Sequence, residues 1–337
     1  MKKSKTFFAC AMLVTLASCS NDHVLSQQSP TPSDPDVINI VAASSKPATR
    51  AAENATNLQN TQFFTGETIN VYLSEHTTED PVITYGNPWV FEVSNSVGSD
   101  GEVTLTPPDG ITPKFLSNNN GVDAYALYPT SVTKTDNGTF TVPTDQSNDK
   151  KYRSADMMFG TNKLGSNGQE IQDFAGTPKG KDVELYFKHQ LAKVIVKMDE
   201  TSFSSDFLNG ATIKLKGVKN EFTYKASKNG VEDIYLTGSN TVDVDLGPYS
   251  TDGNAGIIAP QTITGEAEFI EITTNVSPAQ IYIYKIPTGS SKTFESGKKY
   301  IYNIKLSGGS LVVVSTKIEE WGTGETVDGT ADLKTES

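Results

Sequence analysis

Residues 183–198 read VELYFKHQLAKVIVKM, and this stretch decides the fold class. Residues 183–188 and residues 192–198 each place an apolar side chain at every second position. A period of two is the spacing of side chains on one face of a β-strand. The stretch therefore predicts two strands, over 183–188 and 192–198.

The same period recurs along most of the chain. It is found at 69–73, 213–216, 242–246, 269–276, 280–286, 299–306 and 311–318. Nine Asn-Gly or Asp-Gly pairs, which favour tight hairpin turns, separate or flank these runs. The pairs begin at Asp100, Asp109, Asn120, Asn137, Asn167, Asn209, Asn229, Asp252 and Asp328. Together they predict an all-β protein of antiparallel sheets.

The length and the loop-rich stretch at 160–181 predict two β-sandwich domains in tandem. Because 337 residues are enough for two cores, we place an N-terminal sandwich at 51–180 and a C-terminal sandwich at 181–324. A polar tail follows at 325–337, with few apolar residues.

The composition narrows the classes of function. The chain carries 28 basic and 40 acidic side chains, a net charge of −12, which disfavours nucleic-acid binding. Two Cys and three His leave little for zinc or thiol chemistry. His76 and His189 have no nucleophile or ligand partner at motif spacing, so we expect surface or satisfied sheet-edge histidines. The sequence predicts no enzyme, no metal and no cofactor.

The N-terminus has the pattern of an export signal. Three lysines precede a short apolar run at 7–14, too short to span a bilayer. Leu16-Ala17-Ser18-Cys19 resembles the lipobox of bacterial lipoproteins. We therefore expect a signal peptide at 1–18, lipid on Cys19 and an outer-membrane precursor. The alternative is an ordinary signal peptide that ends near a Cys.

Five segments, in order, resemble the fimbrillin family, the subunits of type V pili, and most of all its Mfa-like group. They are FTGETINVY at 64–72, AYALYP at 124–129, SADMMFG at 154–160, LYFKHQLAKV at 185–194 and IEEWGTG at 318–324. The resemblance implies two transthyretin-like sandwich domains and lipoprotein export. It also implies assembly after cleavage by an arginine-specific protease, with other pilin subunits as partners.

The family's cleavage position falls on the Arg50–Ala51 bond. Arg50 is the only Arg between residues 20 and 60 and follows Pro47 in a polar stretch, where a protease can reach the backbone. A solvated linker Arg is the alternative. Residues 19–50 would then be a propeptide that contains the lipid tether and a removable strand.

The removable strand is the run VINIVAA at 37–43. If it pairs in a sheet, Ile38, Ile40 and Ala42 would face the core. Cleavage would end the tethering that holds the strand in place, and a strand from another subunit could replace it by β-strand addition. The mature subunit would lie at the cell surface, in a fimbrium, and would contribute to cell adhesion through a host or bacterial surface receptor.

Two alternatives stay open. The tail at 325–337 is a poor donor strand, so either it stays solvated or the donor includes part of 311–318; the subunit could therefore lie in the stalk or at the tip. The other interpretation is a surface lipoprotein that keeps its lipid and binds glycans. Trp89 and Trp321 could stack on sugar, although core or edge positions are the expected ones for both.

Overall fold

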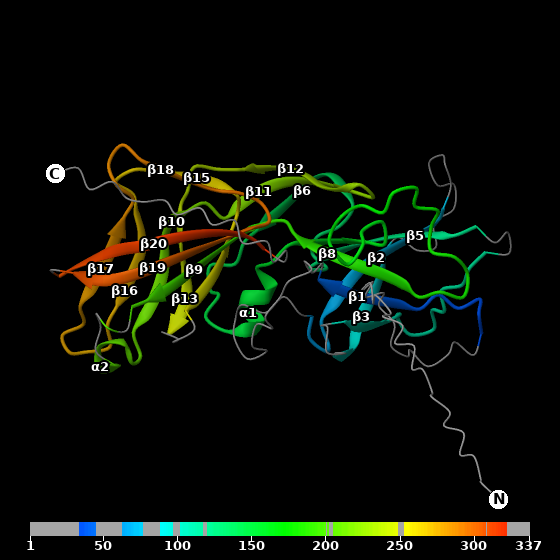
Figure 1. The fold of residues 1–337 in the computed structure, drawn as a ribbon, viewed down its shortest axis with the longest axis horizontal. Coiled ribbons are helices and arrows are strands. Elements are labelled where there is room, and N and C mark those ends of the chain that lie inside the picture. The colour runs from blue at the N-terminus through cyan, green and yellow to red at the C-terminus, as the bar shows by residue number, and fades with distance from the viewer. Residues whose placement is uncertain are drawn as a thin grey trace, which may run out of the picture. The chain divides into compact units, whose positions relative to one another are not determined.

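The computed structural model describes residues 34–44, 63–76, 88–96, 102–116, 120–199, 201, 205–248, 253–307 and 309–321. These residues form twenty strands and two short helices, α1 (Asp149–Ser154) and α2 (Ser205–Leu208) (Figure 1). The all-β prediction is confirmed. The strands expected over 183–188 and 192–198 are β8 (Val183–His189) and β9 (Ala192–Met198).

Seven strands in the N-terminal part form a sheet that closes on itself as a barrel. Their order around the barrel is β1 (Ile40–Ser44), β4 (Val103–Thr106), β3 (Trp89–Ser96), β2 (Thr68–Glu75), β5 (Val122–Tyr128), β7 (Met158–Thr161) and β8. Every pairing is antiparallel except that of β1 with β8, which closes the ring and is parallel.

Two four-stranded sheets in the C-terminal part pack on one shared core. The first contains β13 (Val242–Pro248), β10 (Thr212–Val218), β16 (Glu268–Thr273) and β17 (Ile281–Lys285); the second contains β14 (Asn254–Ile258), β9, β19 (Lys298–Ser307) and β20 (Ser310–Glu320). One cluster of buried side chains draws on both sheets, including Val194, Leu215 and Tyr302. This is the packing of a β-sandwich. Two further strands of this part of the chain, β15 (Gln261–Thr264) and β18 (Ser291–Phe294), form a separate antiparallel pair.

The remaining sheet joins strands from the two halves of the chain. In it β11 (Glu221–Ser227) pairs with β12 (Gly230–Leu236) on one edge and with β6 (Thr135–Thr141) on the other. A cluster of buried side chains contains Leu127 of the barrel and Phe222 of β11. Contacts do not divide residues 32–337 into separate units. The tandem domains and their boundary at residue 180, which falls just before β8 of the barrel, stay a prediction.

The expected hairpin turn at Asn137-Gly138 is wrong. Both residues lie inside β6, where Gly138 is opposite Tyr224 of β11. A Cβ atom at Gly138 would lie 2.4 Å from Cζ of Tyr224, so the ring occupies the space of a side chain. The glycine is required by close packing across the strands and not by a turn.

We expect Gly138→Val to lower the free energy of unfolding by about 1–3 kcal/mol, because the added side chain overlaps the Tyr224 ring. The matched control is Asn137→Ala, an exposed neighbour in the same strand, which should change stability by less than about 0.5 kcal/mol. Urea unfolding of the three proteins measures both effects. Equal stability of the valine variant and the parent would contradict the packing argument.

Candidate functional site at the first strand

Strand β1 and its approach carry the apolar side chains singled out in the sequence. Ile38 is 3% exposed, and Ile40 and Ala42 are each 1% exposed. They belong to the barrel's core cluster, together with Leu105 of β4 and Leu185 of β8. Full burial of an isoleucine stabilises a fold by about 1.5–3 kcal/mol, so this short segment supplies a sizeable part of the core.

The backbone of β1 is paired on both of its edges. On one side Ile40 is opposite Leu105 of antiparallel β4, and on the other side it is opposite Val183 of parallel β8. The pairing with β8 continues to Ser44, which is opposite Phe187. Each ladder hydrogen bond contributes a net ~0.5–1.5 kcal/mol. Strand β1 is therefore an internal strand that joins the two ends of the barrel sheet.

Polar contacts fix residues 34–39, which lead into β1 and are called its approach. The Asp34 carboxylate accepts hydrogen bonds from the Asp36 N–H at 2.9 Å and from Lys114 Nζ at 3.1 Å. The backbone bond from Asp36, helped by Lys114, holds the pKa of the Asp34 carboxyl below its ordinary value of 3.8. Asp36 forms an ion pair with Lys179, and Asn39 Nδ2 donates to Asp182 at 3.3 Å.

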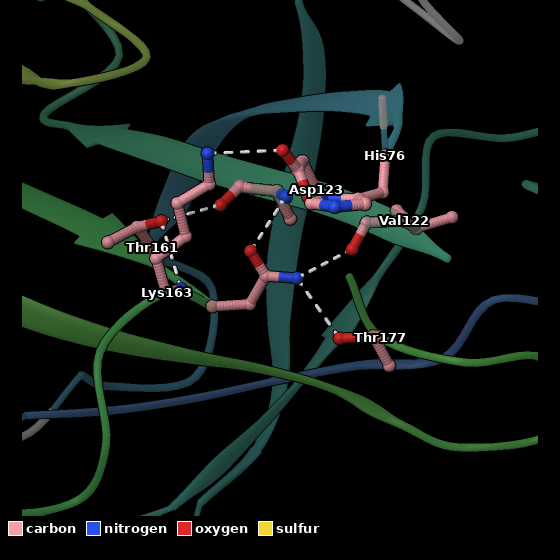
Figure 2. A network of polar contacts seen from close by, with 8 residues as sticks. His76, Val122, Asp123, Thr161, Lys163 and Thr177 are labelled. Carbon is pink, nitrogen blue, oxygen red and sulfur yellow. Dashed lines mark hydrogen bonds and ion pairs between the residues drawn. The ribbon is translucent and has the colours of Figure 1, made fainter. Parts of the chain in front are cut away.

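A buried polar network (Figure 2) holds the connection between β7 and β8. Lys179 and Asp182 lie in the same connection. Asn162 Nδ2 donates to the Val122 carbonyl at 2.8 Å and to Thr177 Oγ1 at 3.0 Å, and its Oδ1 accepts the Ala124 N–H at 2.8 Å. Because both N–H groups and the oxygen of this amide are used, the connection is pinned to β5. This places Lys179 and Asp182, near the end of the connection, beside Asp36 and Asn39.

Beside Asn162, the Asp123 carboxylate lies between the His76 imidazole and the Lys163 ammonium. His76 Nδ1 lies 2.7 Å from Asp123 Oδ1, and Lys163 Nζ lies 3.1 Å from the other carboxylate oxygen of Asp123 (Figure 2). His76 has a polar partner, as expected, but it follows the end of β2, a strand paired on both sides, and does not lie at a sheet edge. The trio ties β2, β5 and the β7–β8 connection together.

The chain re-enters the described structure at Phe63, beside the end of β1. Phe63 is 3% exposed and its ring packs edge-on against Phe187, with 4.8 Å between ring centroids. Phe187 is also the residue opposite Ser44, where β1 ends. Ser44 and Phe63, the described residues on either side of 45–62, thus meet the same residue of β8. We call residues 63–67, which hold this return, the anchor segment.

The predicted processing residues fall in the undescribed parts of the chain. Cys19, Arg50 and Ala51 lie outside the described residues, as does the tail at 325–337. The other donor candidate, 311–318, is described: it is part of β20, which pairs with β19 from Ser310 to Glu320. Leu311 and Val313 are buried there. Donation by this run would break an existing ladder.

His189 is neither of the expected kinds, surface or sheet-edge, because it is buried at the end of β8, a strand paired on both sides. Its Nδ1 lies 2.7 Å from Asp156 Oδ2, with the two side chains 2% and 8% exposed. The Trp321 ring stacks on the imidazole at 3.8 Å and 4°. Lys193 Nζ lies 5.5 Å from the centre of the Trp321 ring. The cluster joins the end of β8, the start of β9 and the end of β20, so its evident role is to hold these elements together.

Neither tryptophan is presented as a platform for sugar. Trp321 is buried, and Trp89 packs against the barrel core while partly buried. Within the described ranges, no three His, Cys, Asp or Glu side chains are grouped so that they could hold a metal ion. Over the same ranges, neither helix is long and apolar enough to cross a membrane.

Comparisons with known proteins give consistent results. A family model described as fimbrillin-like matches residues 49–321. A Bacteroides uniformis protein named "Putative fimbrium subunit Fim1C" is 28% identical over 335 residues, which is 97% of this chain and 99% of that protein.

Two crystal structures, each described as a "putative cell adhesion protein", share the fold. The structure from Bacteroides uniformis has a TM-score of 0.58 at 22% identity and covers 86% of this chain and 99% of its own. The structure from Bacteroides ovatus has a TM-score of 0.57 at 16% identity, with 85% and 97% covered.

We expect Ile40→Ala to lower the free energy of unfolding by about 2–5 kcal/mol, since it opens a cavity in the barrel core. Val41→Ala, on the less buried face of the same strand, is the control and should cost no more than about 1 kcal/mol. Denaturant unfolding measures both. Losses of equal size would mean that β1 does not present Ile40 to a packed core.

The lowered pKa of Asp34 gives a pH prediction. A carboxyl whose pKa is lowered by folding adds stability above its ordinary value, and this contribution is lost as the pH falls through the folded value. At pH 7, Asp34→Asn should therefore speed hydrogen exchange of the Val37 and Ile38 amides, normalised to intrinsic rates. The difference from the parent should narrow below pH 3.8. Asp136→Asn, exposed on β6, is the control, and a difference that is constant with pH would contradict the assignment.

Proposed function

The chain belongs to the fimbrillin-like family, and from this premise we propose that it is a pilus subunit, of the stalk or the tip, assembled by exchange of its first strand. Fimbrial subunits act at the cell surface with other pilin subunits as partners, and this is a family of structural proteins. The finer proposal is that a cut at Arg50–Ala51 makes β1 exchangeable and that a strand from a neighbouring subunit takes its place.

The observation that carries the proposal is the position of β1 between β4 and β8. Neighbouring strands lie about 4.7–4.9 Å apart, so removal of β1 would leave a slot of about 9–10 Å between two unpaired edges. Such a slot accepts one strand. Since β1 is antiparallel to β4 and parallel to β8, the two edges run in opposite directions. An incoming strand in either orientation would therefore form one pairing of each kind.

The proposed cut lies where it separates β1 from an anchored chain. Residues 45–62 begin after Ser44 and end before Phe63, both of which meet Phe187. While this segment is intact, β1 is a tethered ligand of its own barrel, and tethering of this kind corresponds to an effective concentration in the millimolar range. After the cut β1 would be held by its own contacts alone, whereas the downstream chain would stay bound through the anchor segment.

The precursor would reach the outer membrane through lipid on Cys19, with palmitate among its acyl chains. An arginine-specific protease would then cut the covalent link between the mature subunit and its lipid, so that the later departure of β1 would both free the subunit and expose the slot. A bare slot would present two unpaired edges and an apolar floor, a strong template for association. Coupling its exposure to release from the membrane would confine assembly to the cell surface, where the subunit contributes to adhesion. We further propose the two tandem domains of the sequence prediction as its organisation.

The glycan-binding lipoprotein is the competing function. The two tryptophans that prompted it are buried or packed on the core, which favours the pilus subunit. The N-terminal residue of the surface form decides between the two: Ala51 supports processing, whereas a lipid-modified Cys19 as the first residue supports a retained lipoprotein. A Cys19→Ser precursor, which cannot take the lipid, identifies the lipid-dependent band.

We expect the purified precursor to be cut at Arg50–Ala51 by an arginine-specific endopeptidase and then to form polymers, while Arg50→Ala remains monomeric. A synthetic peptide of residues 34–44 should slow polymer growth by refilling the slot. The same peptide with Asp in place of Ile38 and Ile40 is its control and should have no effect. Size-exclusion chromatography and electron microscopy measure assembly.

Two results would overturn the proposal. One is normal polymer formation by uncut Arg50→Ala. The other is complete cutting at Arg50–Ala51 that leaves β1 bound and the protein monomeric in the presence of its partner subunits.

A further inference from the structure

The chain uses arginine at only two positions. Arg50 and Arg153 are the two arginines among 28 basic residues, and all the others are lysines. Any arginine-specific protease therefore has two candidate bonds in the whole sequence, Arg50–Ala51 and Arg153–Ser154. Cutting at the second would divide the chain within α1, between β6 and β7.

The Arg153 side chain is clamped by the anchor segment. Its Nε donates to Glu67 Oε1 at 2.7 Å, and the two side chains are only 20% and 15% exposed. The guanidinium carbon lies 3.9 Å from the centre of the Phe64 ring. Tyr128 Oη donates to the same Glu67 oxygen at 3.1 Å, and the other oxygen accepts the Phe64 N–H at 2.8 Å. The carboxylate is thus shared between Arg153 and the anchor segment.

This contact requires arginine. A planar guanidinium can stack on an aromatic ring and donate in its own plane to a carboxylate at the same time. The ammonium of lysine is a strongly hydrated point charge and cannot do both. The clamp thus gives a physical reason for arginine, and not lysine, at position 153.

The Arg153–Ser154 peptide bond, like the Arg153 side chain, is shielded from a protease. The Arg153 carbonyl accepts the Asp156 N–H at 3.1 Å and lies 3.3 Å from Tyr128 Oη. On either side of the bond, Tyr152 is 3% exposed and Ala155 is 0% exposed. A protease binds its substrate as an extended strand, so productive binding would require unfolding α1 and removing both neighbours from the core.

We propose that the Glu67–Arg153 clamp withholds Arg153 from arginine-specific proteolysis, so that the folded chain offers such an enzyme one bond, Arg50–Ala51. The inference rests on the proposed processing at Arg50 and adds the source of its selectivity. Arg153 is a positioning residue: it fastens the anchor segment to α1, on the downstream side of the proposed cut. The same contact that hides the second arginine holds the mature chain in place while β1 is released.

The test is a timed digest of the full precursor with an arginine-specific endopeptidase, followed by mass spectrometry. In the native chain, cutting at Arg153–Ser154 should be at least ~100-fold slower than at Arg50–Ala51, because it requires local unfolding. In urea the two bonds should be cut at comparable rates. Glu67→Gln should speed native cutting at Arg153–Ser154 at least ~10-fold. Glu92→Gln, exposed on β3, is the matched control and should leave that rate unchanged.

The two bonds give different fragments, so each hypothesis fails separately. Resistance of both bonds in the native chain would refute processing at Arg50 and, with it, the single-bond selectivity, whereas the protection of Arg153 would stand. Rapid native cutting at Arg153–Ser154 would overturn the protection.

A second variant covers the case in which Glu67→Gln does not fold, as judged by circular dichroism. Arg153→Lys removes the second bond from the digest, also in urea, and should speed hydrogen exchange of the 64–67 amides several-fold. Unchanged exchange in folded Arg153→Lys, or unchanged cutting in folded Glu67→Gln, would refute the clamp.

Discussion

The pairing of β1 with two strands at once is the constraint on which the barrel depends. Without β1 the sheet runs from β4 to β8 and has two free edges. With it, Ile40 is opposite both Leu105 and Val183 and its side chain completes the core between them. A strand at an exposed edge could be lost at the cost of one ladder. A strand that closes a barrel takes two ladders and part of the core with it, so its presence or absence defines two distinct states of the protein.

The interactions that hold β1 in the barrel determine which strand from another subunit could replace it. The ion pairs before β1, Lys114 with Asp34 and Lys179 with Asp36, have side chains that are 33–52% exposed, and solvent-accessible pairs of this kind contribute little to stability. The backbone ladders and the burial of Ile38 and Ile40 stabilise the strand more than these pairs do. A backbone ladder is indifferent to sequence, so an incoming strand needs chiefly apolar side chains at alternate positions. Selectivity would come from shape, since the strand must be small where Ala42 is buried.

The sequence predicts where the strands of this protein lie far better than it predicts which strands pair with one another. Alternation at 183–188, 242–246 and 299–306 marks β8, β13 and β19 because alternate apolar side chains of each strand face a core, and this alternation is a local pattern. The closure of Ile40 on Val183 joins residues far apart in sequence, and no local pattern encodes it. Asn137-Gly138 and His189 escape prediction for a related reason. A ring of β11 fills the space at Gly138, and the partners of His189 are Asp156 and Trp321, so distant packing decides both positions.

The arrangement around Phe187 explains how a cut in the chain could act without altering the described contacts of β1. Ser44 is opposite Phe187 and Phe63 packs on its ring, so residues 45–62 join two points that the barrel already holds together. A cut between these two points therefore leaves the described contacts of Ser44 and Phe63 in place. What it ends is the covalent connection: closing a loop of 18 residues costs about 2.5 kcal/mol beyond a constant, and in the uncut chain the contacts of β1 and of Phe63 offset this cost together. Once the chain is cut, β1 no longer returns from solution at the local concentration that its tether set, and a competing strand then needs only to match its contacts.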